Sequence, residues 1–411
     1  MLIKVPRRQV HITLYDVLES LKLLFIGESK KGAEIKKFER ALARYLGCKY
    51  VVSTYSGKQA LYIILKSLDL KEGDEILVPS YTASSVPATI VRVGFKPIFV
   101  DVDPQTFNIN PKLVKEKINK KTRAIIATHI HGLPCDIETL SRICDKYKLF
   151  LIEDCAHALG AEYKGKKIGT FGRASFFSFG MGKHLPTLGG GAIVSDNYKI
   201  IKKARDMMKD LEFPGNFELF FKLVKTIFLS LSTNPIIFSL TVYPFLCIFG
   251  DEFVTKIFET KIPLYGELPK EYKKRFSNMQ ALLALRQVKS LDINLSKRIK
   301  NALILKEQLG NLKDIKLQEY PDFIKHSYLD FAVLVKKREK VIKNLLKNGI
   351  DVQKTWLDNC SVLDDFKSNN ILTPISGKLS RGVIYLPVDS HFDEKTVLRI
   401  SKIVKSVLAI K

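Results

Sequence analysis

Cysteine and tryptophan are scarce in this chain, whose 411 residues include six Cys and one Trp. No two cysteines have the C-x-x-C spacing typical of zinc and iron–sulfur sites, so we expect no metal centre. Single cysteines scattered over a chain of this length predict reduced, mostly buried thiols and a cytoplasmic location. The N-terminal residues lack an apolar core followed by a small-residue cleavage site, which argues against a secretory signal.

Acidic residues are outnumbered, because 42 Asp and Glu stand against 67 Lys and Arg and give a formal net charge of +25. A basic surface favours anionic partners such as nucleic acid, anionic membranes or phosphorylated substrates. A lysine-rich surface that is only solvated accounts for the same charge, and both interpretations stay open. With 46% hydrophobic and 27% charged residues, the composition excludes disordered, collagen-like and coiled-coil chains.

Residues 49–195 alternate between short apolar segments and segments with helical periodicity. Predicted strands cover 49–54, 75–79, 96–102, 124–128 and 149–153, and predicted helices cover 58–68, 84–93, 111–118 and 137–146. Apolar strands that alternate with helices are typical of a sheet buried on both faces. We therefore predict an α/β fold with a mostly parallel central sheet and a ligand site at the carboxyl ends of its strands.

The segment 226–250 contains 25 residues without a charge. This length would suffice for a transmembrane helix, which needs about 20 apolar residues. Polar residues at 232–234 and the prolines at 235 and 244 interrupt the segment, so we predict two short helices joined at Asn234–Pro235. Two alternatives stay open for 217–250: a helical hairpin packed on the core or on a partner subunit, and a hairpin lying in the interface of an anionic membrane.

The two ends of the chain show helical periodicity. Residues 11–46 form a helical pattern broken by glycines at 27 and 32, and the pattern from 275 onward includes an amphipathic run at 297–310. Strand-like segments at 329–335 and 382–387 and helical segments at 338–348 and 393–409 predict a small C-terminal α+β domain. The expected division is a large α/β domain over 1–216, an apolar helical insertion over 217–265, and a helical connection with the small domain over 266–411.

The stretch 151–195 carries the residues with catalytic potential. A predicted strand ends in Glu153–Asp154, a second apolar segment follows at 174–179 and contains Ser178, and Lys183 then lies in a turn bounded by glycines. This arrangement resembles the active site of fold type I pyridoxal phosphate (PLP) enzymes. In those enzymes an acid at a strand end pairs with the pyridine nitrogen, and a lysine amine bonds the cofactor as a Schiff base.

An ordered set of motifs extends the resemblance along nearly the whole chain. In sequence order the motifs are Ser56-Gly57-Lys58, Gly73–Pro79 (GDEILVP), Gly94–Asp103 (GFKPIFVDVD), His129–Gly132, Glu153–Gly160, Phe177–Lys183 and Arg275–Leu282. Each motif alone is weak, whereas their order and the spacing from Asp154 through Ser178 to Lys183 are specific. The chain resembles the DegT/DnrJ/StrS-type sugar aminotransferases, a family of PLP enzymes with fold type I.

The resemblance implies a role for each matching residue. Lys183 would bond PLP, and Asp154 would keep a proton on its pyridine nitrogen. The alternatives from the residues alone are a surface lysine and an aspartate that caps the next helix. The phosphate of PLP would be bound by hydroxyl and backbone N–H groups at Ser56, Gly57 and Ser178.

Several positions depart from the family pattern. His157 stands where glutamine is frequent, near the phenolic oxygen of the cofactor, and a buried structural histidine is the alternative. Lys58 replaces a threonine and would place a cation near the phosphate. Lys273 replaces an asparagine that reaches the phosphate of the neighbouring subunit, so the resemblance implies a homodimer with Lys273 in that role. Ala83 follows the threonine after which family members carry an aromatic stacked on the PLP ring.

The function implied by the resemblance is a PLP-dependent aminotransferase. We expect it to move an amino group, with L-glutamate as donor, to a nucleotide- or lipid-linked keto-sugar for polysaccharide or glycolipid synthesis, with no nucleic-acid partner. The alternatives are a PLP-dependent sugar dehydratase, in whose branch histidine replaces Lys183, and an inert membrane-associated member. The expected location is cytoplasmic, with peripheral contact at the inner face of the membrane through 217–250 as an open alternative.

Overall fold

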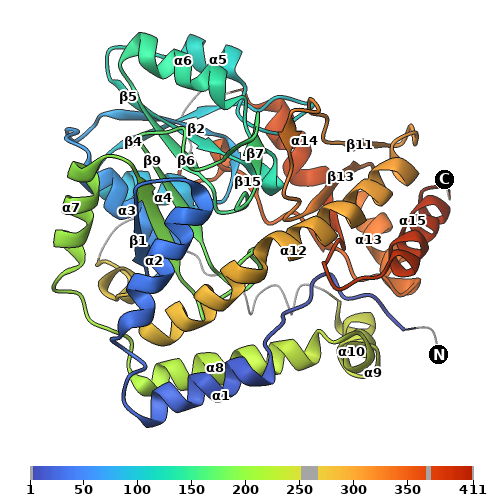
Figure 1. The fold of residues 1–411 in the computed structure, drawn as a ribbon. Coiled ribbons are helices and arrows are strands. Elements are labelled where there is room, and N and C mark those ends of the chain that lie inside the picture. The colour runs from blue at the N-terminus through green and yellow to red at the C-terminus, as the bar shows by residue number, and fades with distance from the viewer. Residues whose placement is uncertain (1–2, 251–266, 367–371, 410–411) are drawn as a thin grey trace.

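A seven-stranded sheet forms the centre of the structure (Figure 1). The computed structural model describes residues 3–250, 267–366 and 372–409. In spatial order the strands are β1 (Tyr50–Thr54), β10 (Gly191–Ser195), β9 (Ala174–Ser178), β6 (Phe150–Asp154), β5 (Thr122–Thr128), β2 (Glu75–Pro79) and β4 (Lys96–Val100). Neighbours from β9 to β4 are parallel, whereas β10 pairs antiparallel with β1 and β9. The predicted α/β fold with a mostly parallel sheet is confirmed.

Helices cover both faces of this sheet (Figure 1). Along β2, Ile76 and Val78 belong to one buried cluster and Leu77 to the other, because successive side chains of a strand point to opposite faces. The helices of the first face are α3 (Gly57–Ser67), α4 (Ser85–Val93) and α7 (Tyr198–Met208). The helices of the second face are α2 (Ala33–Leu46), α5 (Pro111–Lys117), α6 (Ile137–Tyr147) and the first half of α12 (Asn278–Leu309).

The C-terminal part of the chain forms a second, smaller sheet. Its antiparallel strands are, in spatial order, β11 (Ile315–Leu317), β13 (Phe331–Val335), β16 (Val383–Leu386) and β14 (Gln353–Lys354). It packs with the second half of α12, α13 (Arg338–Lys347) and α15 (Glu394–Ala409) in one apolar cluster, and α14 (Pro374–Gly382) packs in another. The long α12 thus contributes to both cores, as its diagonal course in Figure 1 shows.

Short pairings join this part to the end of the central sheet where β2 and β6 finish. The strands concerned are β3 (Tyr81–Thr82) with β15 (Asp358–Asn359), and β12 (Ile324–Lys325) with β7 (Glu162–Tyr163), which also pairs with β8 (Lys166–Lys167). Three single-turn helices are η1 (Ile130–Gly132), η2 (Lys270–Lys273) and η3 (Cys360–Val362). Residues distant in sequence therefore meet at the carboxyl edge of the central strands.

The apolar segment after residue 215 forms helices beside α1 (Leu14–Phe25). They are α8 (Asn216–Ser232), α9 (Pro235–Leu240) and α10 (Val242–Phe249), and α8 lies along α1 at the bottom of Figure 1. The break predicted at Asn234–Pro235 is confirmed, and a second break at Thr241 makes three helices where two were predicted. Pro244 lies in the first turn of α10, where its missing N–H costs no helical hydrogen bond. The rest of the predicted insertion, 251–265, lies outside the described residues.

None of the helices in the described ranges combines the length and the apolarity that crossing a membrane requires.

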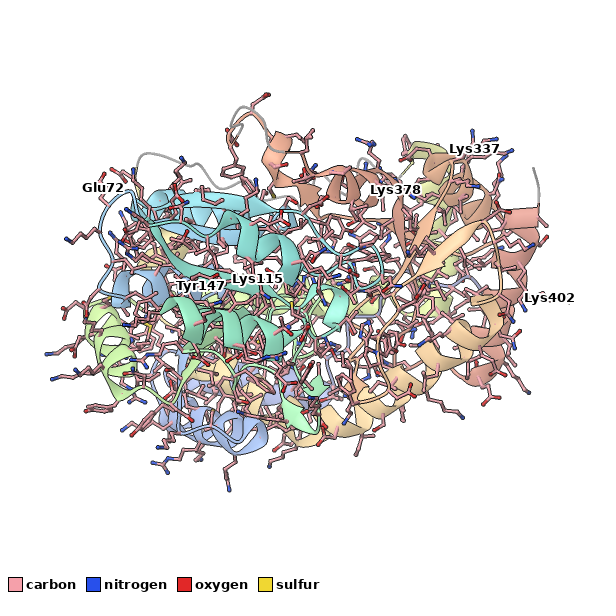
Figure 2. All side chains as sticks on the ribbon, turned by 90° about the horizontal axis from the view of Figure 1, so that it is seen from above. Glu72, Lys115, Tyr147, Lys337, Lys378 and Lys402 are labelled. Atoms are coloured by element: carbon pink, nitrogen blue, oxygen red, sulfur yellow. The ribbon has the colours of Figure 1, made fainter. Side chains whose placement is uncertain are left out.

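The excess of lysine lies on the outer surface. Figure 2 shows the side chains of Lys337 and Lys402 at the edge of the molecule, and these two lysines are exposed, as are Lys115 and Lys378.

Candidate active site

Three strands of the central sheet end at the same edge, and the predicted site residues lie at or just after their ends. Asp154 is the last residue of β6 and pairs in register with Phe176 of β9, two residues before Ser178. β1 ends two residues before Ser56. Because β1, β9 and β6 point the same way in the sheet, their ends lie at the same edge.

The N-terminus of α3 lies against the end of β9. The side-chain oxygen of Ser56 caps this helix by accepting a hydrogen bond from the N–H of Gln59 at 3.1 Å. A Cβ at Gly57 would lie 2.9 Å from the Cβ of Ser178 and 3.3 Å from the carbonyl oxygen of Phe177, so only glycine fits without a shift. The first N–H groups of a helix have no partner within it, and here the start of the helix lies against Ser178. Together these groups form a cradle suited to an anion.

Lys183 lies in the turn between β9 and β10. Phe179 donates its N–H to the carbonyl of Gly190 at 2.8 Å, and Lys183 donates its own N–H to the carbonyl of Gly180 at 3.0 Å. Burial, together with the charge of Arg8, lowers the pKa of the Lys183 amine to about 8, although the carboxylates of Asp330 and Asp154 oppose the shift. At neutral pH a larger fraction of this amine than of an ordinary lysine is therefore unprotonated and able to act as a nucleophile.

Asp154 is buried beneath this turn and held by the backbone. Its Oδ1 accepts a hydrogen bond from the N–H of Ala156 at 3.0 Å. Burial raises the pKa of Asp154, while the Ala156 hydrogen bond and the charge of Lys183 lower it. A carboxylate in such a setting is stabilised by a cationic group placed beside it.

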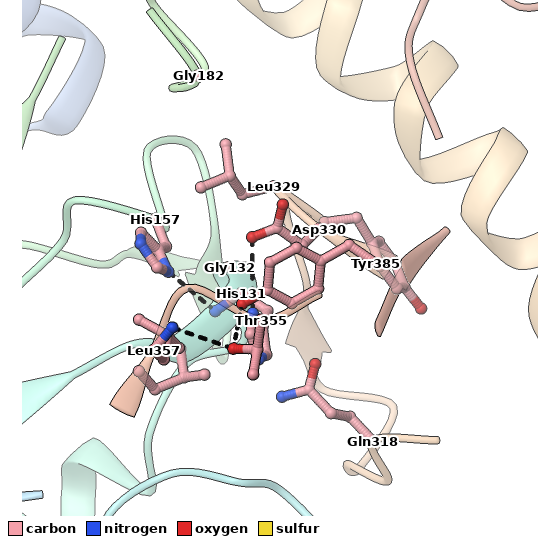
Figure 3. A network of polar contacts seen from close by, with 12 residues as sticks. His131, Gly132, His157, Gly182, Gln318, Leu329, Asp330, Thr355, Leu357 and Tyr385 are labelled. Carbon is pink, nitrogen blue, oxygen red and sulfur yellow. Dashed lines mark hydrogen bonds and ion pairs between the residues drawn. The ribbon is translucent and has the colours of Figure 1, made fainter. Parts of the chain in front are cut away.

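His157 is enclosed by aromatic and polar groups. Its Nδ1 accepts a hydrogen bond from the backbone N–H of His131 at 3.2 Å, so the ring proton is on Nε2 when the ring is neutral (Figure 3). Burial holds the pKa of His157 well below its ordinary value, and the charge of Lys183 acts in the same direction. A neutral His157 can therefore donate a hydrogen bond from Nε2 to an oxygen of a ligand.

His131 and Asp330 extend this network toward the C-terminal part (Figure 3). Nδ1 of His131 lies 3.6 Å from Asp330, and within the described ranges neither ring nitrogen of His131 has a hydrogen-bond partner. Arg8 pairs with the Asp330 carboxylate. Burial opposes ionisation of Asp330, but the charge of Arg8 and the contacts with His131 and His157 together outweigh it and hold the pKa of Asp330 well below its ordinary range.

Lys58 lies in the first turn of α3, and Lys273 lies in η2, which contacts α3. Lys58 pairs with Glu271 of η2 at 3.6 Å, so its charge is shared with a carboxylate. Lys273 at the end of η2 is exposed and pairs with Glu267 at 3.8 Å. The η2 backbone is fixed against α3 because Gln59 Nε2 donates to the carbonyls at 272 and 274, at 2.9 and 2.7 Å.

Two of the sequence motifs have structural roles. Glu153, beside Asp154, accepts hydrogen bonds from three backbone N–H groups at 169, 171 and 172, and so holds the loop that precedes β9. Gly132 has a φ of +98°, and a Cβ there would lie 2.5 Å from the Ser327 hydroxyl. The turn at 129–132 therefore docks the C-terminal part onto the site.

Among the described residues, two groups of ligand-type side chains have donor atoms within 4.8 Å of one another: His129, Glu153 and Cys155, and His131, His157 and Asp330. In the first group the Glu153 carboxylate is occupied by backbone N–H groups. In the second, Arg8 neutralises Asp330 and Nδ1 of His157 accepts a backbone hydrogen bond. The lysine, the aspartate and the anion cradle instead suit an organic cofactor that carries an aldehyde, a basic ring nitrogen and a phosphate.

Three residues at the site were not predicted from the sequence: Arg8, Asp330 and Trp356. Trp356 places its indole ring 4.6 Å from the Lys183 amine. Trp356 is the only tryptophan in the sequence, and this was the one signal that could have drawn attention to it. No local sequence pattern marked Arg8 or Asp330.

Comparison with known proteins yields a match over most of the chain. The sequence profile of the DegT/DnrJ/EryC1/StrS aminotransferase family matches residues 16–216 and 251–405. The uncharacterized protein MJ1066 of Methanocaldococcus jannaschii is 31% identical over 342 residues, which are 82% of this chain and 78% of that protein. The profile leaves out 217–250, the segment that forms most of α8 with α9 and α10.

Curated sugar enzymes match over shorter stretches. The GDP-perosamine synthase of Vibrio cholerae is 41% identical over 175 residues, which are 43% of this chain and 48% of that enzyme. The aligned part thus spans about half the length of that enzyme. The structure of Helicobacter pylori PseC, an aminotransferase involved in the biosynthesis of pseudoaminic acid, has a TM-score of 0.79 at 20% identity and covers 99% of both chains. This likeness confirms the fold.

Proposed function

The chain belongs to the DegT/DnrJ/EryC1/StrS aminotransferase family and is an aminotransferase by that membership, and we propose that it uses PLP to transfer an amino group to a keto-sugar. The expected donor is L-glutamate, and the acceptor is a ketone on a nucleotide- or lipid-linked sugar. Relatives that support a sugar acceptor include GDP-perosamine synthases and a transaminase of a dTDP-linked amino sugar. The expected product serves polysaccharide or glycolipid synthesis.

The observation that carries this proposal is the position of the Lys183 amine. It lies on the turn that follows Ser178 of the anion cradle, and its charge interacts with that of Asp154 at the end of β6. Its lowered pKa makes it a nucleophile toward an aldehyde and later a base that moves a proton. When bound, PLP supplies an electron sink for the carbanion formed at the donor carbon.

The other residues orient the cofactor. Asp154 would hold the protonated pyridine nitrogen, because a buried carboxylate stabilises a neighbouring cation. Ser56, Gly57 and Ser178 would hold the phosphate through hydroxyl and backbone N–H groups. His157, neutral and protonated on Nε2, would donate a hydrogen bond to the phenolic oxygen.

The decisive experiment combines chemical trapping with substitution of Lys183. Reduction of the PLP-loaded protein with borohydride should attach the cofactor to Lys183, as read by peptide mass spectrometry. Lys183→Ala should abolish turnover and the visible absorbance while the protein remains folded. A screen of keto-sugar nucleotides with glutamate, followed by 2-oxoglutarate release, then identifies the acceptor. Trapped PLP on a different lysine would overturn the assignment.

We further propose a homodimer in which Lys273 reaches the phosphate of the partner's cofactor. Two features support this. Lys273 is exposed, and it projects from η2, which is hydrogen-bonded to the same helix α3 whose N-terminus forms the cradle. A two-fold axis beside η2 would bring the lysine of one subunit to the cradle of the other.

We also propose that α1 and α8–α10 rest on an anionic membrane surface, so that a lipid-linked sugar can reach the site. The exposed apolar residues of α8 recur at helical spacing, which makes one continuous stripe. Those of α1 form a second stripe beside it. The exposed apolar residues are Leu14, Tyr15, Leu18, Leu21, Phe25 and Ile26 with α1, Phe217, Phe220, Phe221, Val224, Phe228 and Leu231 on α8, and Ile236, Ile237, Leu240, Phe245, Ile248 and Phe249 on α9 and α10.

Charge and family comparison favour a membrane over a purely structural role for this surface, here called the apolar face. Exposed patches of this extent mark interaction sites. Lys22 and Lys225 are exposed on α1 and α8, and the chain carries a net charge of +25, which attracts anionic lipid. The family profile matches both sides of 217–250 but not this segment, so the shared fold does not depend on it. Burial of one such side chain contributes about 1.5–3 kcal/mol when it is fully withdrawn from water.

A further inference from the structure

The alanine at 83 leaves one side of the candidate site without the aromatic ring expected from family resemblance. Ala83 follows β3 and is partly buried against a cluster that includes Tyr81 and Leu357. Trp356 packs against the same cluster from the C-terminal part. The structure therefore brings the ring of Trp356 to the cluster that Ala83 contacts, although position 83 itself carries no ring.

The backbone around Trp356 is fixed to β3. β15 pairs antiparallel with β3, with Asp358 opposite Thr82 and Asn359 opposite Tyr81. The hydroxyls of Tyr81 and Thr355 are 2.9 Å apart, and the hydroxyl of Thr355 accepts the N–H of Leu357 at 3.1 Å. Because the residues on both sides of Trp356 are held, its backbone has a defined position beside β3.

The indole of Trp356 faces the two groups that would bracket the reactive end of the cofactor. Its ring centroid lies 4.6 Å from the Lys183 amine, within the range of a cation–π contact. The His157 ring lies 4.9 Å away and is inclined at 67° to the indole. Lys183 is the predicted partner of the aldehyde carbon of PLP, and His157 is the predicted partner of its phenolic oxygen. Trp356 therefore lies beside both residues that would contact this side of the cofactor.

We propose that Trp356 takes the place of the missing aromatic at position 83 and covers the PLP ring at its aldehyde side. The electron-rich face of indole stacks favourably on an electron-poor pyridinium ring, and the same face attracts the ammonium of Lys183 before the cofactor is bonded. This assignment rests on the proposed use of PLP. It adds a cofactor contact from the C-terminal part that no motif of the central sheet supplies.

The test uses the single tryptophan as its own probe. Titration of the cofactor-free protein with PLP should quench the emission of Trp356, because a stacked or adjacent pyridoxyl group accepts its excitation energy. Trp356→Ala should raise the Kd of PLP by about three- to tenfold, as expected for one lost aromatic stack, and Trp356→Phe should restore most of the affinity. Phe323→Ala is the matched control, because Phe323 makes a similar contact with Lys164 at 5.5 Å and should leave the Kd unchanged.

A second-site variant separates stacking from a merely structural role. In the Trp356→Ala background, Ala83→Phe should recover the PLP affinity if a ring covering the cofactor is what was lost. The inference is overturned if PLP bonds to Lys183 with no change in Trp356 emission, or if Trp356→Ala binds PLP as tightly as the unchanged protein. It is also overturned if Ala83→Phe gives no recovery while Trp356→Ala lowers the melting temperature of the cofactor-free protein. If no PLP bonds to Lys183 at all, it is the proposed function that fails.

Discussion

Arg8 donates a hydrogen bond at 2.6 Å to the carbonyl oxygen of Gly182, the residue before Lys183. The same guanidinium pairs with Asp330, so one cation links the turn after β9 to the start of β13. This position lets Arg8 act on the Lys183 amine both through its charge and through the backbone of the turn. The two charges have opposite effects, because Arg8 lowers the pKa of Lys183 and Asp330 raises it.

This opposition predicts opposite pH shifts in two variants. The rate at which PLP bonds to the protein should rise with pH around a midpoint near 8, because only the unprotonated Lys183 amine attacks. Arg8→Gln removes the charge that disfavours protonation, so its midpoint should move to higher pH. Asp330→Asn removes a charge that favours protonation, so its midpoint should move to lower pH. Stopped-flow absorbance at a series of pH values measures both.

The control for this pair is Arg8→Lys, which keeps the charge and should keep the midpoint near that of the unchanged protein. Melting temperatures of all three variants show whether they fold, because each neutral substitution leaves its partner's charge unpaired in a buried site. Shifts of equal sign in Arg8→Gln and Asp330→Asn would show that electrostatics at Lys183 do not set the midpoint.

The tight approach of α3 to β9 predicts a selective effect of Gly57→Ala. The new methyl group would lie 2.9 Å from the Cβ of Ser178, so the cradle must open. Overpacking of this kind costs about 1–3 kcal/mol, and we expect the Kd of PLP to rise by about tenfold or more. Gly215→Ala is the matched control, because no atom lies within 4 Å of its new Cβ. Equal affinities of the two variants, measured by equilibrium titration, would contradict the assignment of the phosphate cradle.

The proposed contribution of Lys273 across the dimer can be tested by complementation. Light scattering should give the mass of a homodimer, and Lys273→Ala should weaken PLP binding by about tenfold, as expected for a lost hydrogen bond to a charged group. Lys270→Ala, an exposed lysine of the same turn, should have no effect. Subunits carrying Lys183→Ala and Lys273→Ala are mixed at a PLP concentration too low to load the Lys273→Ala homodimer. A hybrid dimer then has one intact site and should recover activity. A mixture that stays inactive although hybrids form would place Lys273 outside the partner's site.

The apolar face predicts binding to vesicles that contain anionic lipid. Serine at Phe217, Phe228 and Ile248 should reduce cosedimentation with phosphatidylserine vesicles by at least about tenfold, since three exposed apolar side chains no longer leave water. Serine at Ile293 and Leu303, which are exposed on α12, is the matched control. Binding should also weaken with salt.

Substitution at the apolar face is a sharper test than removal of 217–250, because Leu219 and Leu223 of α8 are buried and Glu218 pairs with Lys274. A triple variant that cosediments as well as the unchanged protein would refute a membrane role. If that variant instead changes from dimer to monomer in light scattering, the apolar face is a contact between two copies of the chain.

Much of the fold could be predicted from the sequence because its signals are local. The strands β2, β5 and β6 each contain an apolar run of three or four residues. Helices near them in sequence show regular periodicity and begin at capping residues such as Ser56, Asn110 and Asp136. The meeting of Asp154, Ser178 and Gly57 follows from parallel strands that end at one edge. The order of the motifs along the chain was therefore enough to predict that these residues meet.

The remaining site residues depend on contacts over long sequence separations. Arg8 and Asp330 are 322 positions apart, and nothing in either neighbourhood specifies their pairing. Trp356 reaches Lys183 only because β15 adds to the two-residue strand β3, a pairing too short to leave a periodic signal. The extra break at Thr241 was missed because Ser239 and Thr241 are scattered among apolar residues, and no charge, glycine or asparagine marks the end of α9.

The N-terminal residues before α1 have a consequence for any shortened form of this protein. Val10 donates its N–H to the Thr233 hydroxyl at 3.0 Å and Lys4 donates its N–H to the Ser239 hydroxyl at 2.8 Å, while Arg8 between them reaches the turn of Lys183. A truncated chain that starts at Leu14 would retain every named helix and strand and would be judged intact by circular dichroism. It would nonetheless lose Arg8, whose charge lowers the pKa of the Lys183 amine. It would also lose the N-terminal segment that connects the turn of Lys183 to helices α8 and α9.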